Sequence, residues 1–212
     1  MIYIIVLAGL GYVLLNNGKV QIHRSINSYV GNAILDTFFK YITHLGDGLF
    51  AFTIALIIVF VNVRKSLYIL FSYAGAALVS SILKRVVYTD ICRPHFVFQY
   101  FVREDLKEVQ GVELAGFHSF PSGHALSAFA LFFCLLFISR NQALKILFFL
   151  LAFTASFSRV YLSQHWLIDI YVGSVIGTGF SILFYFIFYK NKSFNKLDKP
   201  LMQLISKNKP GV

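Results

Sequence analysis

Residues 158–169, SRVYLSQHWLID, lie where two strongly apolar stretches meet, 144–162 and 166–189. Ionisable side chains in or beside a membrane span are costly to bury, so Arg159, His165 and Asp169 together indicate a functional site. His165 and Asp169 are four residues apart, which puts them on one face of a helix. The carboxylate can then hold one imidazole nitrogen and direct the other outward, as a nucleophile or base requires. A helix-capping ion pair at the membrane surface explains the same pattern equally well.

The composition indicates a membrane protein, because 58% of the 212 residues are hydrophobic and only 13% are charged. A span needs roughly 17–25 apolar residues, and the candidate runs are 47–63, 66–83, 124–138, 144–162 and 166–189. A further run, 2–15, is short unless it continues to residue 20 with Lys19 directed to the interface. Gly173 and Gly177 form a small-residue stripe that favours close helix packing. The sequence therefore predicts an all-α, polytopic membrane bundle of about six helices, in a single domain covering 1–212.

The charges predict how this bundle is oriented. Connections 62–65 and 139–145 carry basic residues and no acid, and the tail 190–212 adds six lysines against one acid. Such loops are typically cytoplasmic, which places both termini inside and the other eight acids outside. Short loops and a low charge content suggest a bacterial inner membrane, with the acidic loops on the periplasmic side. The net charge of +10 follows from this topology, and no aromatic-basic module indicates a nucleic-acid partner.

The outer side also carries the unusual polar residues. Segment 16–46 has an amphipathic pattern near the helical period and is predicted to lie along the interface. Loop 84–120 is long for a compact membrane protein, which favours a functional role. It ends in the turn 119–124, SFPSGH, where Ser122 is a good N-cap for the helix that follows. The first amides of that helix are a ready anion site beside His124.

Several basic groups could share this anion site. Lys84 closes one predicted span, Arg93 precedes a stiffening proline, and Arg159 lies near the end of another predicted span. Together with Ser122 and the Gly123 amide, they would surround a doubly charged anion with forked and backbone donors. The pattern predicts phosphate binding.

These residues resemble the motifs of the type 2 phosphatidic acid phosphatase (PAP2) superfamily, membrane lipid phosphatases related to vanadium haloperoxidases. Pro-Ser-Gly-His at 121–124 and Ser-Arg-x5-His-x3-Asp at 158–169 are complete and in the family's order. The first motif departs from the pattern: eight residues, not the usual six, separate Lys84 from Arg93-Pro94. Arg85, with seven residues before Arg93, is the alternative candidate for the basic residue of this motif. Lys84 lies on the face of Ala77, Ser80 and Ser81, where small residues favour the bundle interior, so we assign Lys84 to the phosphate site.

The resemblance implies a role for each residue. His165 resembles the nucleophile that takes the phosphoryl group, Asp169 the residue that holds it, and His124 the acid that protonates the leaving oxygen and then activates water. Lys84, Arg93, Ser122, Gly123 and Arg159 resemble the phosphate-binding set. No cofactor is then required, and the six histidines show no spacing typical of a zinc site.

The predicted function is therefore metal-independent hydrolysis of a lipid phosphate or diphosphate through a phosphohistidine at the outer face. The substrate, set among membrane lipids, could be undecaprenyl diphosphate, phosphatidylglycerol phosphate, phosphatidic acid or a lipid A phosphate. A phosphotransferase using the same phosphoenzyme stays open, as does a non-catalytic lipid-binding or lipid-translocating protein, although the complete set of His124, His165 and Asp169 favours an enzyme. Nothing in the sequence indicates an obligate protein partner.

Overall fold

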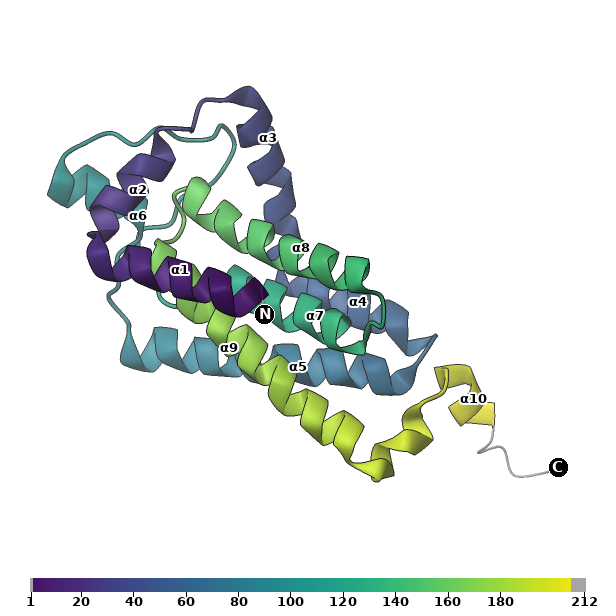
Figure 1. The fold of residues 1–212 in the computed structure, drawn as a ribbon. Coiled ribbons are helices and arrows are strands. Elements are labelled where there is room, and N and C mark those ends of the chain that lie inside the picture. Colours follow the sequence, from purple (N-terminus) through teal and green to yellow (C-terminus); the bar gives the residue numbers. More distant parts are fainter. Residues whose placement is uncertain (1, 207–212) are drawn as a thin grey trace.

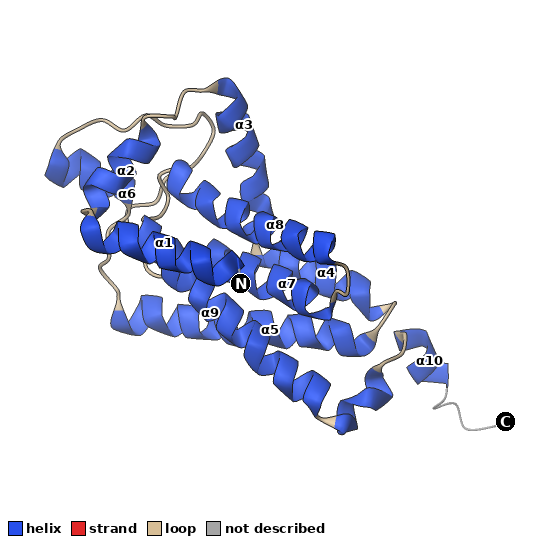
Figure 2. Cartoon of the chain, in the orientation of Figure 1, coloured by secondary structure: helices blue, strands red, loops and turns tan. Residues whose placement is uncertain are grey.

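The structure is a computed structural model that describes residues 2–206. The end of the predicted basic tail, with Lys207 and Lys209, lies outside the described residues. All regular structure in the described range is helical, and the longest loop connects the short helical segment η3 to α7 (Figure 2). The predicted all-α fold is confirmed.

Six helices form the bundle: α1 (Ile2–Asn16), α4 (Gly48–Val59), α5 (Val63–Ile82), α7 (Gly123–Ile138), α8 (Gln142–Tyr161) and α9 (Leu167–Tyr185). Two of them continue as wider π-helical turns, α5 into η2 (Leu83–Val87) and α9 into η4 (Phe186–Lys190). The smaller elements are α2 (Lys19–Asn27), α3 (Ala33–Ile42), η1 (Thr43–Gly46), α6 (Pro94–Val97), η3 (Phe98–Val102), η5 (Lys192–Leu197) and α10 (Leu201–Ser206).

Helix α7 is the centre of the bundle and packs against α5, α8 and α9 (Figure 1). Residues 125–134 of this helix are all buried, as expected for a helix that is apolar all round. Helix α1 is the peripheral member of the bundle: it has no buried residue and lies across the surface of the other helices. The position of α7 fixes where the motif at its N-terminus lies.

Helices α7 and α9 approach closely because glycines face the contact. A Cβ added at Gly177 would lie 2.5 Å from the carbonyl oxygen of Leu126, and one at Gly173 would lie 2.8 Å from that of Ser122. Small residues let helix backbones come together in this way. The small-residue stripe thus brings the N-terminal ends of α7 and α9, which carry His124 and Asp169, side by side.

The predicted count of six spans is not confirmed. By length and composition, three helices could cross a membrane, Val63–Val87, Gln142–Tyr161 and Leu167–Lys190, or five if each of two bent helix pairs counts as one span. Helix α7 is apolar but has only 16 residues. Helix α1 does not continue to residue 20: it ends at Asn16, and α2 leaves at 113°. Lys19 then lies over the Trp166 ring, 4.9 Å from its centroid, which fixes α2 against the bundle.

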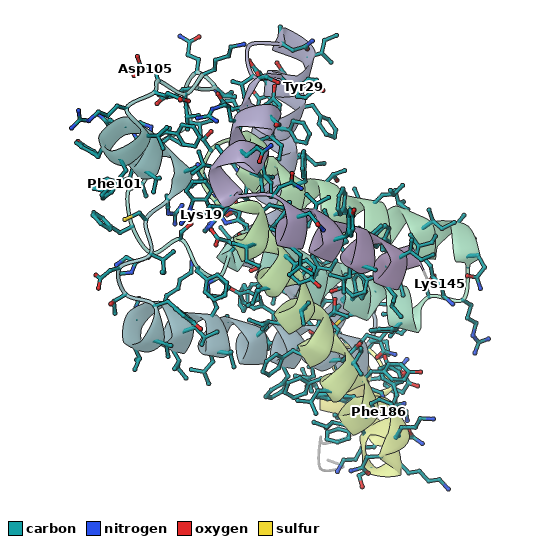
Figure 3. The ribbon with its side chains drawn as sticks, turned by 60° about the vertical axis from the view of Figure 1, so that its left-hand side comes forward. Lys19, Tyr29, Phe101, Asp105, Lys145 and Phe186 are labelled. Atoms are coloured by element: carbon teal, nitrogen blue, oxygen red, sulfur yellow. The ribbon has the colours of Figure 1, made fainter. Side chains whose placement is uncertain are left out.

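The two ends of the bundle differ in character. One end, which we call the cap end, carries α2, α3, α6 and the loop 103–120; Figure 3 labels Tyr29, Phe101 and Asp105 there. Lys145 and Phe186 lie toward the other end, with the basic connections 62–65 and 139–145. Segment 16–46, predicted to lie along the interface, forms the separate helices α2 and α3, and Asn32 caps α3 by accepting from the amides of Ile34 and Leu35.

Candidate active site

The three motifs meet at the cap end of the bundle. Lys84 lies in η2 at the end of α5, His124 in the first turn of α7 and Arg159 in the last turn of α8. His165 lies in the turn 162–166, and Asp169 in the first turn of α9. Four helix ends therefore carry the residues that the sequence selects.

His165 is held by Asp169. The two side chains are 2% and 1% exposed, and His165 Nδ1 lies 3.3 Å from Asp169 Oδ2. The same oxygen accepts hydrogen bonds from the backbone N–H of Trp166, at 2.9 Å, and from Ser119 Oγ. The carboxylate is thus fixed in place, and its contact with Nδ1 leaves Nε2 as the ring nitrogen that can react.

Helix α2 supports the turn that carries His165. His23, which is 1% exposed, lies with Nε2 3.1 Å from Ser163 Oγ, and its ring packs edge-on against Trp166. Ser163 has φ +55°, in the left-handed region that non-glycine residues adopt only when the surroundings hold them there. Sequence reasoning gave His23 and Ser119 no role, because His23 belongs to no periodic or charged pattern and Ser119 counted only as part of the turn 119–124.

Arginines line the site from two directions. Arg93 donates from Nη1 to the carbonyl oxygen of Gln164 at 3.1 Å and from Nε to that of Phe117 at 2.9 Å. Arg159 is 8% exposed and donates from Nη1 to Thr43 Oγ1 at 2.9 Å. Its buried Nε has no hydrogen-bond partner among the described residues. A buried donor without a partner is costly, and a bound anion would satisfy it.

The cations act on His165. Burial, together with the charges of Arg93, Arg159 and Lys84, holds the pKa of His165 well below its ordinary value. The imidazole is therefore neutral at neutral pH, which is the form that can attack an electrophile. The cations also repel one another, so an anion bound between them would be stabilised.

Ser122 and Gly123 begin α7 at this site. Ser122 Oγ accepts from the amide of Ala125 at 3.4 Å, so the predicted N-cap is confirmed. The Ser122 amide donates to the carbonyl oxygen of Asp169 at 3.1 Å, which ties the α7 N-terminus to α9. The first amides of a helix lack partners within it and favour an anion.

A cavity of about 270 Å³ adjoins the site between η1, α4, α5 and α7. Lys84 and His124 line it, and a Cβ added at Gly123 would lie 3.9 Å from Lys84 Nζ. Arg85 is exposed and does not line this cavity. The wider turn of η2 takes up part of the long interval before Arg93, which gives a physical reason for the unusual spacing.

This placement predicts a difference between two neighbouring cations. Lys84→Ala should lower kcat/KM for a lipid phosphate about 10²–10³-fold, as loss of a single charge-stabilising donor typically does. Arg85→Ala, which removes the same charge from an exposed position, should stay near the wild-type value. Phosphate release from the two purified variants measures this. A larger loss in Arg85→Ala, in protein that inserts and folds, would place Arg85 in the site instead.

Within residues 2–206, no group of three or more His, Cys, Asp or Glu side chains is arranged so that it could hold a metal ion. Four of the histidines instead pair with carboxylates: His44 and His124 with Asp47, His95 with Glu108, and His165 with Asp169. Sequence reasoning had counted Asp47 only among the outer acids.

A membrane-embedded helical bundle that gathers two histidines, an aspartate and three cations at one end has the architecture of a membrane phosphatase. The chain belongs to the PAP2 superfamily of membrane phosphatases, whose family model matches residues 65–193, more than half of the chain. A lipid A 4'-phosphatase from Bacteroides thetaiotaomicron is 36% identical over 97 residues, which are 46% of this chain and 43% of that protein. The match thus spans less than half the length of that relative.

Two crystal structures share the fold. LpxE from Aquifex aeolicus superposes with a TM-score of 0.66 at 24% identity, over 77% of this chain and 92% of that one. The first transmembrane PAP2-type phosphatidylglycerolphosphate phosphatase from Bacillus subtilis superposes with a TM-score of 0.64 at 23% identity, over 91% of this chain and 96% of that one. Both support a multi-pass membrane protein.

Proposed function

We propose that this protein hydrolyses a lipid phosphate or diphosphate, without a metal ion, through a phosphohistidine on His165. The observation that carries the proposal is the buried His165 imidazole, which is held by Asp169 and feels the charges of Arg93, Arg159 and Lys84. Such a site combines a nucleophile with a pocket for a doubly charged group. The motifs within 84–169 supply the whole catalytic set in a single domain.

In the first step, the lone pair on His165 Nε2 attacks phosphorus. The bond from phosphorus to the lipid oxygen breaks, its electrons go to that oxygen, and His124 protonates it. Asp169 keeps Nδ1 of His165 oriented and stabilises the positive charge that develops on the ring. The products of this step are the free lipid alcohol, or the lipid monophosphate from a diphosphate, and the phosphoenzyme.

In the second step, His124 takes a proton from water, whose oxygen attacks phosphorus. The phosphorus–nitrogen bond breaks, its electrons return to Nε2, and inorganic phosphate leaves. Lys84, Arg93, Arg159 and the amides of Ser122 and Gly123 neutralise charge on the phosphoryl oxygens in both steps. Phosphoryl transfer depends mainly on such positioning and charge stabilisation.

The substrate carries its phosphate on a lipid. The catalytic residues lie at an end of the bundle where large apolar side chains are exposed on the helices, among them Leu49, Leu78 and Ile82. The basic connections lie at the opposite end, which favours a cytoplasmic location for that end and an outer, periplasmic face for the site. In a bacterial inner membrane, the candidates are undecaprenyl diphosphate, phosphatidylglycerol phosphate, phosphatidic acid and lipid A phosphates.

A panel of these four lipids tests the proposal. The purified protein in detergent should release inorganic phosphate from at least one of them, at a rate that wild-type protein shows and His165→Ala lacks. Release from none would contradict the proposed hydrolase. Transfer of the phosphoryl group to a second lipid, without release of phosphate, would identify a phosphotransferase instead.

Activity should survive excess EDTA, and vanadate should inhibit competitively. Cationic side chains and amides form the phosphate site, and vanadate resembles five-coordinate phosphorus in the transition state. Steady-state rates with varied lipid and vanadate measure the competition. Loss of activity in EDTA that added divalent ion restores would contradict the metal-free mechanism.

A further inference from the structure

We propose that Asp47 is a positioning residue that holds His124 and supports its positive charge when it acts as the acid. The inference depends on the proposed function, because it concerns the same reaction. Asp47 lies outside the three motifs, in the turn between η1 and α4.

The contact between these side chains is direct. Asp47 Oδ1 lies 2.9 Å from His124 Nε2, and both side chains are partly buried, at 41% and 26% exposure. With Nε2 turned to Asp47, Nδ1 is the ring nitrogen that can face the leaving oxygen or the attacking water. This arrangement repeats the way Asp169 holds His165, with the roles of the two ring nitrogens exchanged.

The position of Asp47 shows that its side chain is not serving the helix that follows. Asp47 is the N-cap residue of α4, where aspartate normally accepts a hydrogen bond from an amide of the first turn. Its side chain makes no such bond. The carboxylate is turned instead to His124 and, through Oδ2, to His44 Nδ1 at 3.2 Å. The Asp47 carboxylate thus contacts His124 and does not cap α4.

Segment η1 is itself fixed against the site. A Cβ added at Gly46 would lie 3.0 Å from the carbonyl oxygen of His124, so the backbone before Asp47 packs directly on the first turn of α7. Thr43, at the start of η1, accepts the hydrogen bond from Arg159. Contacts with Arg159 at Thr43 and with His124 at Gly46 therefore hold both ends of η1 and fix the position of the Asp47 carboxylate.

Charge explains what Asp47 contributes. Burial and the charges of Arg159 and Lys84 disfavour a positive charge on the His124 ring, whereas the contacting carboxylate of Asp47 favours it. The acid that protonates a lipid alkoxide must first carry that charge. The carboxylate of Asp47 therefore offsets part of the cost of a positive charge on His124 within a cationic site.

The first experiment compares two substrates. We expect Asp47→Asn to lower kcat/KM for a lipid phosphate about 10–10²-fold, part of the 10²–10⁴-fold typical of general acid catalysis. An activated aryl phosphate needs little help from an acid, so p-nitrophenyl phosphate should lose less than about threefold. Its retained turnover also reports that the variant is folded. Asp105→Asn, a matched change in the exposed loop of the cap end, should leave both values unchanged.

The second experiment is a double-mutant cycle. If Asp47 acts through His124, Asp47→Asn should add no further loss to His124→Ala with the lipid phosphate. Equal losses on both substrates, or a full additional loss in the double variant, would overturn the inference and leave Asp47 a structural residue. The wild-type protein is measured first on the lipid panel, so failure of the proposed hydrolysis is recognised separately from failure of the Asp47 inference.

Discussion

His165→Ala is expected to abolish phosphoryl transfer from every substrate, activated or not. No other neutral, buried imidazole lies beside Asp169 in the described part of the chain, so its loss removes the nucleophile and not merely an aid to it. Asp169→Asn should fall between this variant and wild type, because the imidazole stays while its orientation and charge support weaken. Rates on a lipid phosphate and on p-nitrophenyl phosphate measure both effects.

The decisive measurement is a radiolabel trapped on the protein during turnover. A phosphohistidine is acid-labile and base-stable, so wild-type protein quenched with base should retain label and His165→Ala should not. His95→Ala, which removes a histidine paired with Glu108 rather than with Asp169 or Asp47, serves as the control and should retain label. Label on His165→Ala would place the nucleophile elsewhere and overturn the assignment of roles.

Local spacing explains what the sequence could predict. His165 and Asp169 come together because one helical turn separates them, and Ser122 caps α7 because the residues of its turn are adjacent in the chain. The apolar runs also predict the bundle, since each carries its own signal for membrane insertion. The sequence puts Lys84 and Gly123 near the two ends of the loop 84–120, but only the fold brings them together, with an added Gly123 Cβ 3.9 Å from Lys84 Nζ.

Contacts between segments far apart in the chain could not be predicted from the sequence. His23 and Ser163 are 140 positions apart, and Thr43 and Arg159 are 116 apart, with no pattern that links them. In the sequence, nothing distinguishes Asp47 from the other acids of the outer side. Only the fold shows that its carboxylate contacts His124. Of the alternatives for the first span, continuation to residue 20 does not occur, because the chain turns at Gly18 and α2 packs against the turn carrying His165.

His124→Ala is expected to cost about 10²–10⁴-fold in kcat/KM on a lipid phosphate, the usual value of general acid assistance. Expulsion of a lipid alkoxide requires a proton, and His124 borders the cavity where the departing oxygen would lie. p-Nitrophenolate leaves without that proton, so the defect should shrink by a similar factor on the aryl phosphate.

The parameter kcat/KM is the right one for this comparison, because it reports the steps up to departure of the leaving group and not hydrolysis of the phosphoenzyme. That second step also needs His124, as the base that activates water. His124→Ala should therefore form the phosphohistidine from the aryl phosphate and then release phosphate slowly, so trapped label should exceed the wild-type amount. Equal defects on both substrates, with no label, would assign His124 to binding of the phosphate and would leave protonation of the lipid oxygen to another group.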